Sequence, residues 1–268
     1  HATRTAMHTL AATLAPNTAS AAWRRALAAC VWLALNSSIA QAVPSSAAAA
    51  QLARTRTLDI RHIAVDLRFD WKARQAIGVA LITLSPLSPT RRITLDAGRL
   101  AIDAVSLADG KPLRFDYDGG DRDDGLTITL DRRYRPSESL TLRIAYRSTW
   151  ANHSDPNNLW GSNGKGLRFL GPTASDARRR PQIWASGEPG SSRYWLPGFD
   201  DPAQLRTAEL TATVPKPLQV LAGGSLVSVR DNADDTRTYH WRIDTPHASH
   251  RTLFAVGDYR HHALAHEG

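Results

Sequence analysis

The stretch IAVDLRF at residues 63–69 places a large apolar side chain at every second position. Because successive side chains of a β-strand point to opposite faces, this period of two is typical of a strand with one buried face. No long segment of the chain has a convincing apolar stripe of helical period. The stretch therefore predicts an all-β protein.

The same alternation returns along most of the chain. Five further segments show it: residues 77–81, 126–130, 140–146, 210–214 and 239–243. Turn-forming residues separate these segments, among them Pro86, Pro89, Asp109-Gly110, Gly119-Gly120 and Pro136. Many short strands joined by such turns predict antiparallel sheets in a multi-sheet body.

Composition narrows the function classes. The chain has 268 residues, of which 42% are hydrophobic, and a single cysteine, Cys30. One cysteine excludes a disulfide within the chain and a cysteine-based zinc site. The net charge of +8 includes three arginines before residue 43, and the remaining arginines are spread along the sequence. A basic stripe for nucleic acid is therefore not expected.

The N-terminal residues have the order of a secretory signal peptide. Arg24-Arg25 precede an apolar run at 26–35, and Ala40-Gln41-Ala42 forms an A-x-A cleavage site. We expect a signal peptide at 1–42 and a flexible lead-in at 43–56. The run is too short to span a bilayer, which needs roughly 20 apolar residues, so stable membrane insertion after cleavage is not expected. The mature chain would be secreted or periplasmic.

Two alternatives to this leader stay open. Leu27-Ala28-Ala29-Cys30 resembles a lipoprotein box, although the apolar run mostly follows the cysteine instead of preceding it. A disordered Ala-rich tail is the other alternative, but it does not explain the order of charge, apolar run and small-residue site. After the leader we expect one β-domain at 57–262 and the start of a linker at 263–268.

Residues 150–206 interrupt the strand pattern. They are rich in Gly, Pro, Asn, Asp and Trp, and a long irregular stretch in a compact domain is usually functional or disordered. Its tryptophans argue against disorder, because large aromatic side chains favour burial. A surface for a ligand or a second domain is expected here.

Several weaker motifs have simpler interpretations. The acidic stretch FDYDGGDRDDG at 115–125 departs from the calcium-loop pattern, which favours an acidic hairpin turn. Arg178-Arg179-Arg180 is interpreted as a solvated loop cluster, with a docking role kept open. His247 and His250 are interpreted as strand-end histidines, and His266-Glu267 as a chance match to a zinc motif. The chain contains neither H-E-x-x-H nor G-x-S-x-G.

One loop carries a sharper signal. Glu188 lies between Gly187 and Pro189, five residues before Arg193, in the segment WASGEPGSSRYWLPGFDDP at 184–202. A carboxylate on such a turn can bind a substrate's ammonium group through charge-assisted hydrogen bonds. The structural alternative is that Glu188 or Asp200 pairs with Arg193 across the turn.

This segment resembles the N-terminal domain of the aminopeptidase N family of zinc metallopeptidases. Glu188-Pro189, Arg193, Pro197, Phe199-Asp200 and Pro202 match the family's Q-x-E-P-x-x-x-R-x-x-F-P-C-F-D-x-P-like stretch in register. Downstream, Phe254-Ala255-Val256-Gly257-Asp258-Tyr259 is similar to the family's F-A-V-G-D-F/Y. The likeness covers roughly residues 57–260.

The resemblance implies a saddle-shaped all-β domain packed on a thermolysin-like catalytic domain. It implies that Glu188 anchors the free α-amino group of a peptide substrate. Ser186, a shorter donor and acceptor, stands where the family usually has Gln, so the resemblance implies that Ser186 belongs to the substrate-binding site with Glu188. Gly198 replaces a common cysteine. The family's zinc ligands are expected beyond residue 268. This chain alone is expected to bind no stoichiometric zinc and to release no amino acid from a substrate. We therefore expect no catalytic and no metal-ligating residue within it.

Two other functions remain open. The fold could serve as a non-catalytic binding or scaffold module, through the Trp-rich face of residues 150–206. It could also be an unrelated sandwich that stacks sugars on Trp160, Trp184 and Trp195. A zinc-binding helix encoded in frame after Gly268 would support the peptidase over the free-standing module.

Overall fold

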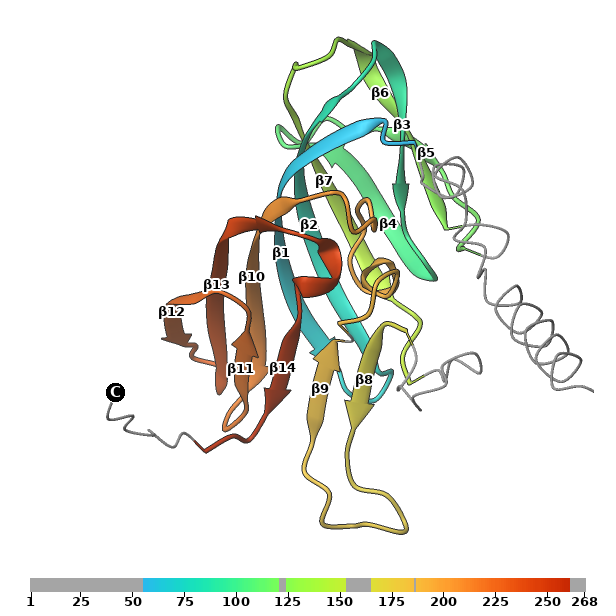
Figure 1. Ribbon diagram of the computed structural model, residues 1–268. Coiled ribbons are helices and arrows are strands. Elements are labelled where there is room, and N and C mark those ends of the chain that lie inside the picture. Colours follow the sequence, from blue (N-terminus) through green and yellow to red (C-terminus); the bar gives the residue numbers. More distant parts are fainter. Residues whose placement is uncertain (1–54, 121–123, 153–164, 186, 261–268) are drawn as a thin grey trace, which may run out of the picture. The chain divides into compact units, whose positions relative to one another are not determined.

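A computed structural model describes residues 55–120, 124–152, 165–185 and 187–260 (Figure 1). The expected signal peptide, all but the end of the lead-in, and the expected linker lie outside these residues. Within them, regular structure consists of strands and two short 3-10 turns, η1 (Ser192–Tyr194) and η2 (Ser249–Arg251). No helix in these ranges is long and apolar enough to cross a membrane. The predicted all-β class is confirmed.

The described strands form three sheets. The largest contains β1 (Leu58–Asp70), β2 (Gln75–Pro86), β4 (Leu100–Leu107), β7 (Leu140–Ser148), β10 (Arg206–Pro215), β12 (Ser225–Asp231) and β13 (Thr236–His247), in the order β12-β13-β10-β1-β2-β7-β4. A second contains β8 (Leu167–Leu170), β9 (Gln182–Ala185), β11 (Gln219–Ala222) and β14 (Phe254–Gly257), in the order β11-β14-β9-β8. A third contains β3 (Thr90–Asp96), β5 (Arg114–Asp116) and β6 (Gly125–Tyr134), in the order β3-β6-β5.

The expectation of purely antiparallel sheets is wrong at one pair of strands. β1 and β10 run parallel at the centre of the large sheet, with His62 opposite Thr207 and Leu67 opposite Ala212. An antiparallel pair can be joined by a tight hairpin, whereas a parallel pair needs a long connection. Here most of the domain lies between the two strands, so no hairpin fixes their direction.

The buried face of β2 differs from its apolar pattern. Ile77 and Leu81 are 45% and 39% exposed, while Ala76, Ala80 and Ile82 are fully buried. Gly78 explains why small residues take the inner face: a Cβ there would lie 2.6 Å from the Leu67 Cδ2 atom. The large side chains of β1 fill this space, so β2 keeps small residues beneath them and turns Ile77 and Leu81 outward.

The core lies between the large sheet and the smaller sheets. Phe69 of β1 contacts Phe169 of β8 and Phe254 of β14, with ring centroids 6.5 Å and 5.7 Å apart. Trp195 packs edge-on against Phe254 at 5.2 Å and is fully buried. Burial of each such side chain contributes about 1.5–3 kcal/mol. The irregular 150–206 stretch therefore supplies core residues as well as β8, β9 and η1.

Candidate functional site

Glu188 lies on a tight turn between β9 and η1. The carbonyl of Glu188 accepts a hydrogen bond of 3.1 Å from the Ser191 backbone N–H. Pro189 and Gly190 occupy the two central positions, and Gly190 has a φ of 78°. A proline followed by a glycine with positive φ is the signature of a type II turn. The local sequence therefore fixes the backbone that carries the Glu188 carboxylate.

Neighbouring elements hold this turn on two sides. The Ser191 hydroxyl is buried and accepts a 3.1 Å hydrogen bond from the Gly166 backbone N–H. A Cβ added to Gly187 would lie 3.5 Å from the His250 carbonyl oxygen and 3.4 Å from Leu253 Cδ2, so the turn also borders η2. Glu188 is partly exposed and Leu253 is 43% exposed. A carboxylate and an apolar side chain thus share one accessible edge.

A cluster of charges lies behind the turn, centred on Arg193. Its guanidinium Nε is 3.4 Å from Asp200 Oδ2, Nη1 is 3.3 Å from Asp124 Oδ2, and Nη2 is 3.7 Å from Asp96 Oδ2. Burial acts to lower the pKa of Arg193, but Asp96, Asp200 and Asp124 together hold it above its ordinary value. The proposed pairing of Asp200 with Arg193 is confirmed.

Asp200 joins this arginine to the opposite side of the cluster. It is only 6% exposed, and its Oδ1 accepts a short hydrogen bond from the Ser249 hydroxyl of η2. Arg206, only 3% exposed, lies in the field of Asp200; burial lowers the pKa of Arg206 to about 10, and Asp200 opposes this shift. Arg206 Nη1 also donates to the Thr252 hydroxyl at 2.9 Å. The cluster therefore fixes η1, β10 and η2 relative to one another.

Sequence reasoning missed Asp96, which completes the cluster. Asp96 lies at the end of β3 and is 3% exposed. Its Oδ2 accepts a 2.7 Å hydrogen bond from the Asp200 backbone N–H, and Gly198 exchanges backbone hydrogen bonds with it. About a hundred residues separate the two partners, so no local pattern could have shown the contact.

The other sequence candidates are structural or lie outside the described residues. Ser186 is outside them, as are Trp160 and His266. The acidic stretch joins antiparallel β5 and β6, which confirms the hairpin, and Asp118 Oδ1 accepts the Gly120 N–H at 3.0 Å. His247 is buried at the end of β13, with Nε2 2.8 Å from the Thr252 hydroxyl.

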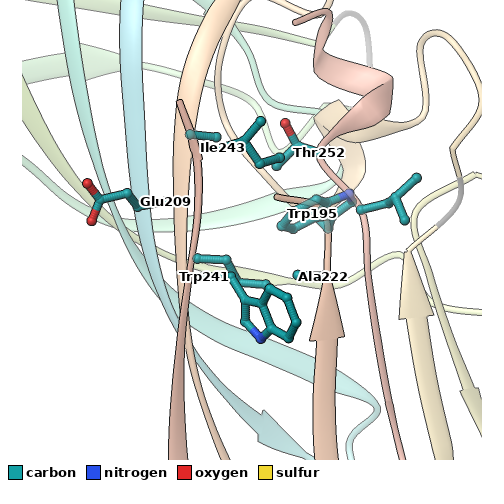
Figure 2. Close-up of a pocket in the computed structure, with 10 residues that line it drawn as sticks. Trp195, Glu209, Ala222, Trp241, Ile243 and Thr252 are labelled. Carbon is teal, nitrogen blue, oxygen red and sulfur yellow. The ribbon is translucent and has the colours of Figure 1, made fainter. Parts of the chain in front are cut away.

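Of the tryptophan candidates that the structure describes, Trp195 cannot belong to a sugar platform. Trp195 is fully buried and so cannot stack on a ligand. The hollow beside Trp195 and Trp241 has a volume of about 10 Å³, which is space for one water at most. Figure 2 shows Glu209 on the other side of the strand, pointing away from this hollow. Trp184 is partly buried within β9.

The fold and this turn define a class: a three-sheet β-domain that presents a carboxylate at its edge. Residues 60–250 match the family of the Peptidase M1 N-terminal domain. The match covers most of the chain, and the chain belongs to this family. The resemblance to the aminopeptidase N family is thereby confirmed.

Relatives with solved structures share the fold. A two-domain M1 zinc metallopeptidase mutant bound to L-tryptophan is 21% identical with a TM-score of 0.62, over 76% of this chain and 43% of that one. An M1 zinc metallopeptidase mutant from Deinococcus radiodurans, bound to a Tyr-Ser-Ala substrate, is 22% identical with the same TM-score, over 75% and 43%.

Curated relatives include a peptidase and a transcription factor. Leucine aminopeptidase 2 of Vanderwaltozyma polyspora is 25% identical over 202 residues, which are 74% of this chain and 28% of the relative. Transcription initiation factor TFIID subunit 2 of Danio rerio is 31% identical over 97 residues, which are 35% of this chain and 8% of the relative. The chain thus spans less than a third of either curated relative.

Proposed function

We propose that this chain is the substrate-anchoring domain of a zinc-dependent aminopeptidase, and that Glu188 binds the α-ammonium group of the peptide. One observation carries the proposal: a type II turn with a fixed backbone places the partly exposed Glu188 at an accessible edge of the domain. An enzyme that requires a free ammonium group removes residues only from the N-terminus of a peptide.

The fixed backbone strengthens this binding. A carboxylate that is already positioned loses little conformational freedom when a ligand arrives, so more of the interaction appears as affinity. Hydrogen bonds between ionised partners are roughly twice as strong as neutral ones. The partly exposed Leu253 at the same edge adds an apolar contact for the substrate or for the domain that closes over it.

Zinc belongs to the proposed enzyme but not to the described residues. No group of three or more His, Cys, Asp or Glu side chains that could hold a metal ion occurs within 55–260, apart from the gaps at 121–123, 153–164 and 186. The residues that the structure describes therefore do not fit a zinc site. We therefore assign the metal and its chemistry to a separate catalytic domain, and to this chain only the anchoring of substrate. The leader at 1–42 directs the enzyme to the periplasm or the medium.

Replacing Glu188 by Gln tests the anchor in the enzyme that carries this domain. E188Q keeps the size of the side chain but removes its charge, so kcat/KM for aminoacyl-anilides should fall about tenfold to a hundredfold. E138Q, a matched change in the turn after β6, should leave kcat/KM unchanged. The proposal fails if E188Q retains wild-type kcat/KM in a folded enzyme.

A scaffold function is the second candidate. It is favoured by the likeness to TFIID subunit 2, a protein whose name describes a transcription factor and not a peptidase. Here the domain would bind other proteins and Glu188 would have no ligand. This alternative predicts that the natural protein shows no zinc-dependent release of amino acids, even with the wild-type Glu188.

A further inference from the structure

A second hollow lies at the far end of the β8–β9 hairpin from Glu188. It has a volume of about 300 Å³, within the range of small-ligand pockets. Its walls come from the β1–β2 turn, the start of the loop after β8, and the end of that loop. Figure 1 shows the β1–β2 turn beside β8 at this end of the domain. None of its lining residues belongs to the Glu188 turn or the Arg193 cluster.

Two arginines, Arg74 and Arg179, line this hollow. Both residues are exposed, and no ion pair to either guanidinium occurs among the described residues. The neighbouring Arg180 is different, because its Nη1 lies 2.8 Å from Asp258 Oδ2. Of the three consecutive arginines, only Arg179 lines the hollow, which separates its role from that of Arg178 and Arg180.

The backbone of Arg74 points to a role for its side chain. Arg74 has a φ of 55°, in the left-handed region where Gly or Asn is favoured over a long side chain. A turn that needed only this conformation would be more stable with Gly or Asn. The presence of an arginine there, in the lining of a hollow, is explained if its guanidinium binds a ligand.

Part of the remaining wall is aromatic and is held by ring packing and hydrogen bonds. Trp71 packs edge-on against Phe169, with ring centroids 5.9 Å apart. The Asn152 side chain bonds both backbone groups of Phe169: its Nδ2 donates to the carbonyl at 2.8 Å, and its Oδ1 accepts from the N–H at 2.7 Å. The hollow therefore offers two cations beside an apolar wall that is already fixed.

We propose that this hollow binds a compact oxyanion, carboxylate or phosphate, attached to an apolar or aromatic body. Two guanidinium groups bind such oxyanions through charge-assisted and often bidentate hydrogen bonds. The aromatic wall of Trp71 and Phe169 would contact the body of the ligand. This proposal does not depend on the function of Glu188.

Titration of the full chain with three probes tests this site. N-acetylphenylalanine carries a carboxylate, phenyl phosphate carries a phosphate, and N-acetylphenylalanine amide is a neutral control. Because every probe lacks a free ammonium group, Glu188 does not contribute. Calorimetry should show that at least one of the two anions binds at least about tenfold more tightly than the neutral amide. The anion that binds more tightly shows whether the hollow prefers a carboxylate or a phosphate.

Four variants locate the site. R74N and R179Q should each weaken anion binding at least about tenfold, while R178Q and E188Q should leave it unchanged. R74N should keep or raise the melting temperature, since Asn tolerates the left-handed conformation; lost binding would then not reflect unfolding. The proposal is overturned if neither anion binds more tightly than the amide, if R74N and R179Q bind normally, or if R178Q weakens binding equally.

Discussion

Asp200 is a buried residue of the candidate site that holds the loop carrying Glu188 in place. It accepts hydrogen bonds from the Arg193 backbone and the Ser249 hydroxyl, and it lies in the field of Arg206. The matching positions in the sequence motif thus include one partly exposed carboxylate, Glu188, and one buried carboxylate that holds the loop in place. Their roles differ because their burial differs.

Replacing Asp200 by Asn should destabilise the domain strongly. Loss of one member of a buried ionic cluster leaves its partners uncompensated and typically costs about 3–5 kcal/mol. Urea unfolding of D200N measures this loss. D201N, a neighbouring change at a less buried carboxylate, should cost about 1 kcal/mol or less. Equal stability of D200N and the wild type would contradict the structural role of the cluster.

His247 should make stability depend on pH. Desolvation by burial lowers the pKa of His247 below 6.5, and the charges of Arg206 and Arg251 act in the same direction. Near and below pH 6.5 the imidazole of His247 therefore binds a proton more readily in the unfolded chain than in the folded one. The free energy of unfolding falls as the pH falls below 6.5. His62 is shifted in the same direction, mainly by desolvation.

The variant H247Q should lose part of this pH dependence. The free energy of unfolding, measured in urea at pH 7.5 and at 5.5, should differ less between the two conditions in H247Q than in the wild type. As a control, R61Q at the exposed neighbour of His62 should retain the wild-type difference. An unchanged difference in H247Q would show that His247 does not carry the effect.

At the scale of elements, the sequence pattern predicts that β2 is a strand, but packing determines which of its faces is buried. Both strands of the β1–β2 hairpin were predictable, because apolar residues alternate in each. The inward face of β2 was not, because Ala76, Gly78 and Ala80 are small and give a weak signal while Ile77 and Leu81 give a strong one. Only the contact of Gly78 with Leu67 shows why the small residues lie inside.

Two alanine substitutions test the face of β2. Ile82 is fully buried and Leu81 is 39% exposed. I82A should cost about 2–5 kcal/mol of unfolding free energy, because it removes buried methyl groups and leaves a cavity. L81A should cost less than about 1 kcal/mol. Chemical unfolding of the two variants gives the comparison, and a larger loss for L81A would mean that the strand faces the other way.

The candidate site was predictable to a similar extent. Glu188 was identified from its Gly and Pro neighbours, which dictate a turn whatever the rest of the fold does. The sequence suggested Glu188 or Asp200 as the partner of Arg193 and did not decide between them. It gave no sign of the other two partners, Asp96 and Asp124. Ion pairs between distant segments depend on the sheet arrangement, which local patterns do not contain.

At the scale of the whole molecule, the function proposed above has the described domain supply a fixed edge for the substrate and a separate domain supply the chemistry. Its three sheets share one core, and the Arg193 cluster ties the Glu188 turn to that core. Such a frame can hold a carboxylate within the tolerance that substrate positioning needs. The proposed anchor therefore follows from the architecture as much as from the motif.

The most direct test is a crystal structure of the enzyme carrying this domain, with a peptide bound as in the Deinococcus radiodurans relative. The measured quantity is the distance from the Glu188 carboxylate oxygens to the nitrogen at the N-terminus of the peptide. Our account predicts a charge-assisted hydrogen bond of about 2.7–2.9 Å. A bound peptide whose ammonium group lies beyond hydrogen-bonding distance of Glu188 would contradict it.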